Sequence, residues 1–111
     1  MDHKFKEVTF GTYQEACTGT AIYDGSLAVV YPAMGLANEA GEVLGKVKKK
    51  LRDGGDYNVA DLKAEIGDVL WYMAALCTDL DIDLEDVALS NLDKLQSRMD
   101  RGVIGGSGDD R

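Results

Sequence analysis

The chain has 111 residues and a formal net charge of −8, with one histidine, two cysteines and a single proline. This length suits one domain with one hydrophobic core and a high surface fraction. The negative charge argues against a nucleic acid polymer as partner, because that backbone is anionic as well. No apolar run approaches the roughly 20 residues that span a bilayer. No signal peptide is recognisable either, so we expect a cytoplasmic protein that does not contact a membrane.

In chain order, the sequence predicts four helices, over residues 9–22, from 27 or 32 to 52, from 58 to 79, and from 83 to 101. Thr12 and Glu15 are available as a capping box for the first helix. Pro32 suits the first turn of the second helix, and two glycines after residue 53 break that helix. Asn58 together with Asp61 can cap the third helix.

These elements predict one all-α domain over residues 1–111 with a four-helix bundle-like fold, since no strand pattern is convincing. Residues 1–8 and 102–111 are expected to be flexible termini. The second of these has four glycines and could instead fold over a site. Cys17 and Cys77 lack an export context and are expected to be reduced. The third helix carries extra apolar residues outside its main seam, namely Leu70, Trp71, Ala74 and Cys77. This surface predicts a homodimer or a dimer of dimers, that is, a homotetramer.

Two carboxylate pairs stand at helical spacing: Glu39 with Glu42, and Glu65 with Asp68. The members of each pair lie one turn apart and about 60° apart around the helix axis. Such a pair is often a solvated face. Here each pair borders an apolar seam, and four carboxylates beside a core repel one another unless a cation holds them. Carboxylate oxygens are the ligands that Mg²⁺ prefers. The two seams run through Ala33, Leu36, Ala40, Val43 and Val47, and through Leu62, Ile66, Val69, Met73, Leu76 and Leu80.

The fourth predicted helix repeats this arrangement with the opposite charge. Its seam runs through Leu84, Ala88, Leu92, Leu95 and Met99. A polar-to-basic stripe borders this seam and consists of Asn91, Lys94, Arg98 and Arg101. Acidic pairs on two helices and a basic row on a third predict a site for a metal-chelated polyanion.

Three stretches in order, GLANEAGEVLGKVKKKLRD, AEIGDVLWYMAAL and NLDKLQSRMDRG, resemble the MazG-like nucleoside triphosphate pyrophosphohydrolases. That all-α superfamily is marked by ExxE followed by ExxD on the next helix. The resemblance covers roughly Tyr13 to Arg111. It implies that Glu39, Glu42, Glu65 and Asp68 bind Mg²⁺, for which Mn²⁺ could substitute, and that Lys94 and Arg98 hold substrate phosphates.

The resemblance further implies hydrolysis of a nucleoside triphosphate to monophosphate and pyrophosphate, with nucleotide-pool house-cleaning as one role. Glu39 or Glu42 could act as general base instead of ligand. The preferred base and sugar and the number of metal ions stay open. The alternative function is a non-catalytic helical interaction or regulatory module, which would show no Mg²⁺ dependence.

Further residues have two interpretations each. Lys46 and Lys49 could neutralise phosphate charge, or Lys46 could pair with Glu42 as ordinary helix stabilisation. Tyr72 lies one turn beyond Asp68 and could contact the substrate or belong to the core. Tyr13 and Gln14 are weaker candidates for contact with the base. Four glycines fall inside predicted helices, where glycine is unfavourable: Gly35, Gly41, Gly45 and Gly67. They predict either close contacts between helices or room for metal and phosphate.

Overall fold

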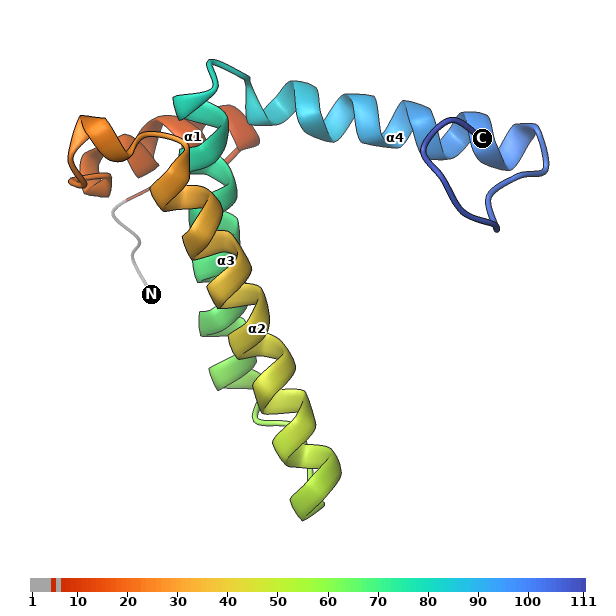
Figure 1. Cartoon of the computed structure of the whole chain (residues 1–111), viewed down its shortest axis with the longest axis horizontal. Coiled ribbons are helices and arrows are strands. Elements are labelled where there is room, and N and C mark those ends of the chain that lie inside the picture. The colour runs from red at the N-terminus through yellow and green to blue at the C-terminus, as the bar shows by residue number, and fades with distance from the viewer. Residues whose placement is uncertain (1–4, 6) are drawn as a thin grey trace.

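The computed structural model describes Phe5 and residues 7–111, and all regular structure in this range is helical, as predicted. Two helices form an antiparallel hairpin, a short helix packs at one end of it, and the last helix leaves that same end and runs away from the hairpin (Figure 1). The helices are α1 Phe10–Cys17, α2 Val30–Asp53, α3 Val59–Asp79 and α4 Leu84–Asp100, with 3₁₀ turns at Thr18–Thr20 and Gly25–Leu27 between α1 and α2.

Helix α1 begins one residue after the predicted start at residue 9 and ends five residues before the predicted end at residue 22. Its capping box joins Thr9 and Thr12: the Thr12 amide donates to Thr9 Oγ1 at 3.1 Å, and the Thr9 amide donates to Thr12 Oγ1 at 2.7 Å. The predicted box of Thr12 and Glu15 is therefore wrong by one turn. The α-helix ends at Cys17 because the Thr-Gly-Thr stretch that follows is a poor helix former. The Thr18 hydroxyl donates to the Glu15 carbonyl at 2.6 Å, which competes with helical bonding.

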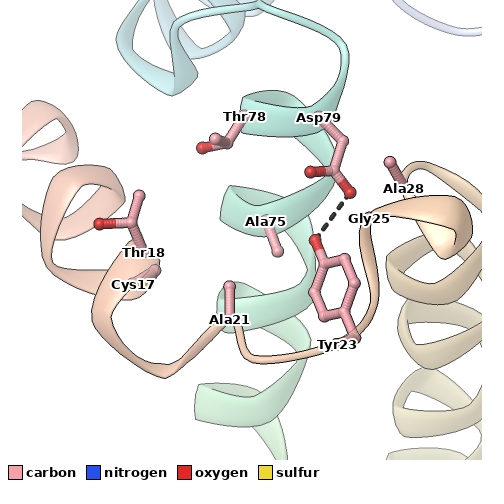
Figure 2. A pocket seen from close by; sticks show the side chains of 9 residues that line it. All are labelled: Cys17, Thr18, Ala21, Tyr23, Gly25, Ala28, Ala75, Thr78 and Asp79. Carbon is pink, nitrogen blue, oxygen red and sulfur yellow. Dashed lines mark hydrogen bonds between the residues drawn. The ribbon is translucent and has the colours of Figure 1, made fainter.

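Helix α2 starts after a strained residue, Val29, whose φ is +69° and whose side chain provides no cap. A positive φ is unfavourable for a β-branched residue, so neighbouring contacts must hold it. Asp79 Oδ2 accepts from the Tyr23 hydroxyl at 2.7 Å, as Figure 2 shows. The same oxygen accepts from the Val29 amide at 2.9 Å. Pro32 lies in the first turn, as predicted, and is fully buried.

The α2–α3 turn follows the sequence prediction. Gly54 and Gly55 have φ angles of +79° and +83°, which glycine adopts without steric cost. The Asn58 side chain accepts from the Asp61 amide at 3.2 Å and caps α3. The two glycines allow the tight turn and Asn58 starts the next helix, so the two long helices lie side by side.

The α3–α4 turn depends on a residue from α1. Asp83 is the N-cap residue of α4, but its side chain makes no capping hydrogen bond. Gln14 Oε1 accepts from the Leu84 amide at 2.8 Å, and Gln14 Nε2 donates to the Ile82 carbonyl at 2.9 Å. Both ends of this amide are therefore engaged in structure, which argues against Gln14 as a contact for the base.

The small core lies where α1, α3 and the start of α4 meet. Its buried residues are Cys17, Ala74 and Leu84, with Tyr13, Trp71 and Cys77 packed against them. Both cysteines are free thiols, as expected. No described helix is both long enough and apolar enough to cross a membrane.

One chain does not close the predicted four-helix bundle. The radius of gyration is 16.9 Å, whereas a compact chain of this length has about 13 Å. The seam of α4 faces solvent along most of its length, with Leu92 63% and Met99 58% exposed. The reason is geometric, since α4 points away from the hairpin after the short turn and has no helix beside it for most of its length (Figure 1).

Candidate metal centre

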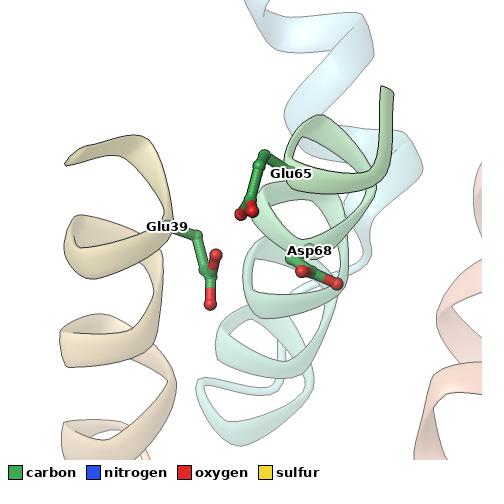
Figure 3. Close-up of side chains that lie close together, drawn as sticks. All are labelled: Glu39, Glu65 and Asp68. Carbon is green, nitrogen blue, oxygen red and sulfur yellow. The ribbon is translucent and has the colours of Figure 1, made fainter. Parts of the chain in front are cut away.

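Three of the four predicted ligands meet between the hairpin helices. Glu39 on α2 faces Glu65 and Asp68 on α3 (Figure 3), and one carboxylate oxygen of each lies within 4.8 Å of the others. Glu39 and Glu65 are half-buried, whereas Asp68 is exposed. The i,i+3 spacing on α3 places Glu65 and Asp68 on one face of the helix, and the antiparallel pairing of α2 brings Glu39 opposite them.

The proximity of these acids changes the titration of Glu39. Its pKa is raised above the usual value, first because the protonated carboxyl shares a hydrogen bond with Glu65 and then by desolvation. The negative charges of Glu65, Asp68 and Glu42 add to the shift. Glu42 is exposed and does not belong to the three-carboxylate group, although it acts on Glu39 electrostatically. Oxygen donors that repel one another and lie this close are a donor set that fits a hard divalent cation such as Mg²⁺.

Lys46 interacts with α3. Its Nζ atom lies 3.9 Å from Glu65 Oε1 and 4.0 Å from Asp61 Oδ2. These long contacts are worth little individually, but they place a positive charge at the edge of the acidic group. Lys49 lies further along α2, where it lines a cavity of about 350 Å³ at the turn end of the hairpin, together with charged residues such as Asp53 and Asp61.

Tyr72 lies beside the acidic group because Gly35 makes room for its ring. A Cβ atom on Gly35 would lie only 2.2 Å from the nearest ring atom of Tyr72. In the part of the chain that the structure describes, a Cβ placed on Gly41, Gly45 or Gly67 meets no packed neighbour within 4 Å, so of these four glycines Gly35 alone makes the predicted close contact there. Substitution of Gly35 therefore forces the Tyr72 ring to move.

A cavity of about 330 Å³ opens next to the carboxylates and is lined by Thr20, Glu39, Asp68, Trp71 and Tyr72. The Tyr72 ring meets Trp71 edge-on at 5.1 Å and Tyr31 at 6.2 Å between centroids. Its pKa is raised, first by a hydrogen bond with Tyr31, then by desolvation and by the charges of Tyr31, Glu39 and Asp68. Trp71 Nε1 donates to Thr20 Oγ1 at 2.8 Å. Trp71 and Thr20 also line a larger apolar cavity of about 510 Å³ against α1.

The basic stripe lies elsewhere. Helix α4 carries Asn91, Lys94 and Arg98 away from the hairpin, so a single chain does not bring them to the carboxylates (Figure 1). Asn91 and Lys94 are exposed and line a shallow cavity of about 410 Å³ on α4. Arg98 is buried, with 4% of its surface exposed, under the C-terminal segment.

Sequence reasoning missed Thr20, Tyr31 and the anchoring role of Asp79. None belongs to a motif, and each reaches its partner across more than 40 positions of the chain. A helical pattern carries no signal for such contacts. Gly35 was noted in the sequence, but only the structure separates it from the other helical glycines.

Comparisons with known proteins agree with this geometry. Residues 33–103, more than half of the chain, match the family described as MazG nucleotide pyrophosphohydrolase domain. The "Gene 37 protein" of Mycobacterium phage L5 is 51% identical over 109 residues, which cover 89% of this chain and 96% of that protein. No solved structure matches the chain significantly. The matched range contains both acidic pairs and the whole basic stripe, and the chain belongs to the MazG nucleotide pyrophosphohydrolase family.

Proposed function

We propose that this protein is a Mg²⁺-dependent pyrophosphohydrolase that cleaves a nucleoside or deoxynucleoside triphosphate to the monophosphate and pyrophosphate. The observation that carries the proposal is the convergence of Glu39, Glu65 and Asp68 within 4.8 Å in a chain of the MazG family. Such a group lowers its mutual repulsion by binding a divalent cation. Mn²⁺ is expected to substitute because it accepts the same oxygen ligands.

Each acidic residue has a proposed part in the reaction. Glu39, Glu65 and Asp68 would hold the metal, with Glu42 as a fourth ligand. Bound Mg²⁺ would supply charge for the phosphate oxygens and lower the pKa of a water molecule. Glu39 or Glu42 would take the proton of the attacking water, because a carboxylate next to the site can act as general base.

The bond broken would be the one between the α- and β-phosphates. Lys94 and Arg98 would balance the charge that develops on the leaving pyrophosphate, and Asn91 would add a polar contact beside them. Lys46 and Lys49 would face the polyphosphate from α2. Hydrolysis in ¹⁸O-labelled water should place the label in the monophosphate. Label in the pyrophosphate would instead mean attack at the β-phosphorus.

A second copy of the chain would complete the site. In one chain the basic stripe points away from the carboxylates, and the seam of α4 is exposed at Leu92 and Met99. An exposed apolar stripe of this kind is typical of a surface that another subunit covers. We therefore include a homodimer, or a homotetramer built from two dimers, in the proposal. The basic stripe of one subunit would then reach the carboxylates of another.

The nucleoside would lie on the aromatic side of the carboxylates. Tyr72 and Trp71 line the cavity next to Glu39 and Asp68, and this cavity shares Trp71 and Thr20 with the apolar cavity against α1. Aromatic rings stack on any base, so these residues support nucleoside binding without selecting one base. A panel of natural and deaminated nucleotides, assayed for pyrophosphate with Mg²⁺, would identify the substrate and test the house-cleaning role.

The direct test replaces single carboxylates. Glu65→Gln and Asp68→Asn should lower turnover at saturating Mg²⁺ by at least about 10²-fold and weaken Mg²⁺ binding, while the helical fold is kept. Asp56→Asn in the exposed α2–α3 turn removes the same charge away from the group and should remain active. Near wild-type turnover of either first variant would show that the metal site is wrongly assigned. Absence of any Mg²⁺-dependent pyrophosphate release from the wild type would favour the non-catalytic interaction module.

A further inference from the structure

The C-terminal segment 102–111 forms a closed loop on the end of α4. Gly102 has a φ of +73° and turns the chain back, so that the Val103 amide donates to the Arg98 carbonyl at 2.8 Å. The Arg111 guanidinium then closes the loop by donating to four of its backbone carbonyls, those of Val103, Ile104, Gly105 and Gly108. The flexibility predicted for this terminus stays a prediction, and the segment predicted to be flexible at residues 1–8 lies largely outside the described residues.

This loop covers Arg98, the proposed phosphate contact. Arg98 Nη2 donates to the Asp109 carbonyl at 3.0 Å and lies 3.6 Å from Asp109 Oδ1. Arg98 Nε is buried and has no hydrogen-bond partner among the described residues. Because a guanidinium stays charged, a buried donor without a partner is costly. The closed loop therefore leaves the hydrogen-bonding capacity of Arg98 incompletely used.

The chemistry of Arg98 indicates what would use it. A guanidinium binds a phosphate in a fork, with two parallel N–H donors on two oxygens. The Asp109 carboxylate provides only one long ionic contact, and this side chain is 93% exposed, so it can leave without being pulled from a core. A phosphate oxyanion in the same place could engage both Nε and Nη2.

We propose that Asp109 occupies the phosphate position of Arg98 in the free protein and that the pyrophosphate end of the substrate displaces it. The C-terminal loop is thus a strap that competes with the substrate for the same guanidinium. This inference rests on the proposed function, since the strap would regulate the phosphate contact of the proposed active site. The strap extends beyond the range that matches the family, which ends at residue 103.

The test uses inorganic pyrophosphate as probe on the full chain, in EDTA, so that neither turnover nor a bound metal contributes. Asp109→Ala should lower the dissociation constant of pyrophosphate about five-fold, the factor expected when a weak ion pair no longer competes. Asp110→Ala is the matched control, because Asp110 is an exposed neighbour of equal charge that makes no ion pair in the described part of the chain. Arg98→Ala should abolish the difference between the two variants.

A second readout separates competition from a structural role. Asp109→Ala should lower the apo melting temperature slightly, since Arg98 loses the ionic contact with the Asp109 carboxylate and keeps only the backbone carbonyl, and should increase the stabilisation by pyrophosphate. With triphosphate substrate, KM should fall and kcat should stay unchanged. Equal or weaker pyrophosphate binding by Asp109→Ala, an equal gain in Asp110→Ala, or no binding to any variant overturns the inference. Failure of the proposed function would show differently, as absent triphosphate turnover in the wild type while the pyrophosphate difference persists.

Discussion

The α2–α3 hairpin and the α4 arm have similar amphipathic patterns but differ in how the chain uses them. In the hairpin, each helix covers part of the seam of the other, although Ile66 stays 57% exposed, and the packing brings three acids from two helices within 4.8 Å. In the arm, a seam of the same type remains exposed, and the basic stripe beside it has no acidic helix opposite (Figure 1). An amphipathic pattern therefore states that a helix has a partner, but not whether that partner belongs to the same chain.

The largest expected effect tests whether hairpin and arm act together across subunits. Asp68→Asn and Arg98→Ala should each lower kcat by about 10²- to 10³-fold, since each removes charge that stabilises the transition state. Mixing the two inactive variants under conditions of subunit exchange should restore part of the wild-type turnover, because mixed oligomers contain an intact hairpin facing an intact arm. The control mixes Asp68→Asn with Glu65→Gln, which share the hairpin and should stay inactive. A mixture of Asp68→Asn and Arg98→Ala without regained activity contradicts assembly in trans.

A smaller effect is expected from adding a side chain at Gly35, where the hairpin helices pack closely against Tyr72. Gly35→Ala places a Cβ atom within 2.5 Å of three Tyr72 ring atoms. The resulting overpacking should cost about 1–3 kcal/mol of stability, and the displaced ring should raise the KM for substrate.

The matched control is Gly41→Ala on the same helix, where no packed neighbour among the described residues lies within 4 Å of the new Cβ atom. It should gain up to about 1 kcal/mol from helix propensity. Thermal unfolding measures the stability of both variants, and a Gly35→Ala protein as stable as the wild type would contradict the close packing of Gly35 against Tyr72. A loss in Gly41→Ala would indicate that a second copy covers that face.

The junction of the two regions is tested at Asp79, the last residue of α3. Asp79→Asn keeps the size of the side chain but loses the charge that strengthens its bonds with Tyr23 and Val29. We expect a loss of about 1–2 kcal/mol in the free energy of unfolding, measured by urea denaturation. Asp81→Asn is the control, because Asp81 lies in the same turn at a φ of +58°, which asparagine also tolerates. Equal stability of both variants would mean that Asp79 does not anchor the start of α2.

The smallest expected effect concerns alkaline pH. Burial and the hydrogen bond to Asp79 raise the pKa of Tyr23 to about 12, whereas an unfolded tyrosine ionises near a pKa of about 10. The unfolded chain therefore loses this proton first. The contribution of Tyr23 to stability should be complete below about pH 10 and should be lost as pH rises toward 12. Tyr23→Phe should show a shallower fall in this range, measured by denaturation at several pH values. Identical slopes would contradict a protonated, anchored Tyr23.

The sequence alone determined the four helices, the glycine turn of the hairpin, the cap at Asn58 and the identity of three acids that meet. Each of these follows from contacts within a few residues or from a strict helical period, which a linear pattern records. The end of α1 was mispredicted because a 3₁₀ turn replaces the α-helix after Cys17, and the predicted capping box was one turn too late because Thr12 bonds back to Thr9.

Tertiary structure decided the remainder. Where the chain turns after each helix decides the direction of α4 and the packing of Tyr72 against Gly35. It also decides that Asp79 accepts two hydrogen bonds and that the C-terminal loop covers Arg98. A helix period specifies which side chains share a face, but it contains no term for the angle between helices. That angle arises from short turns and from single side chains such as Gln14, which hold elements distant in sequence.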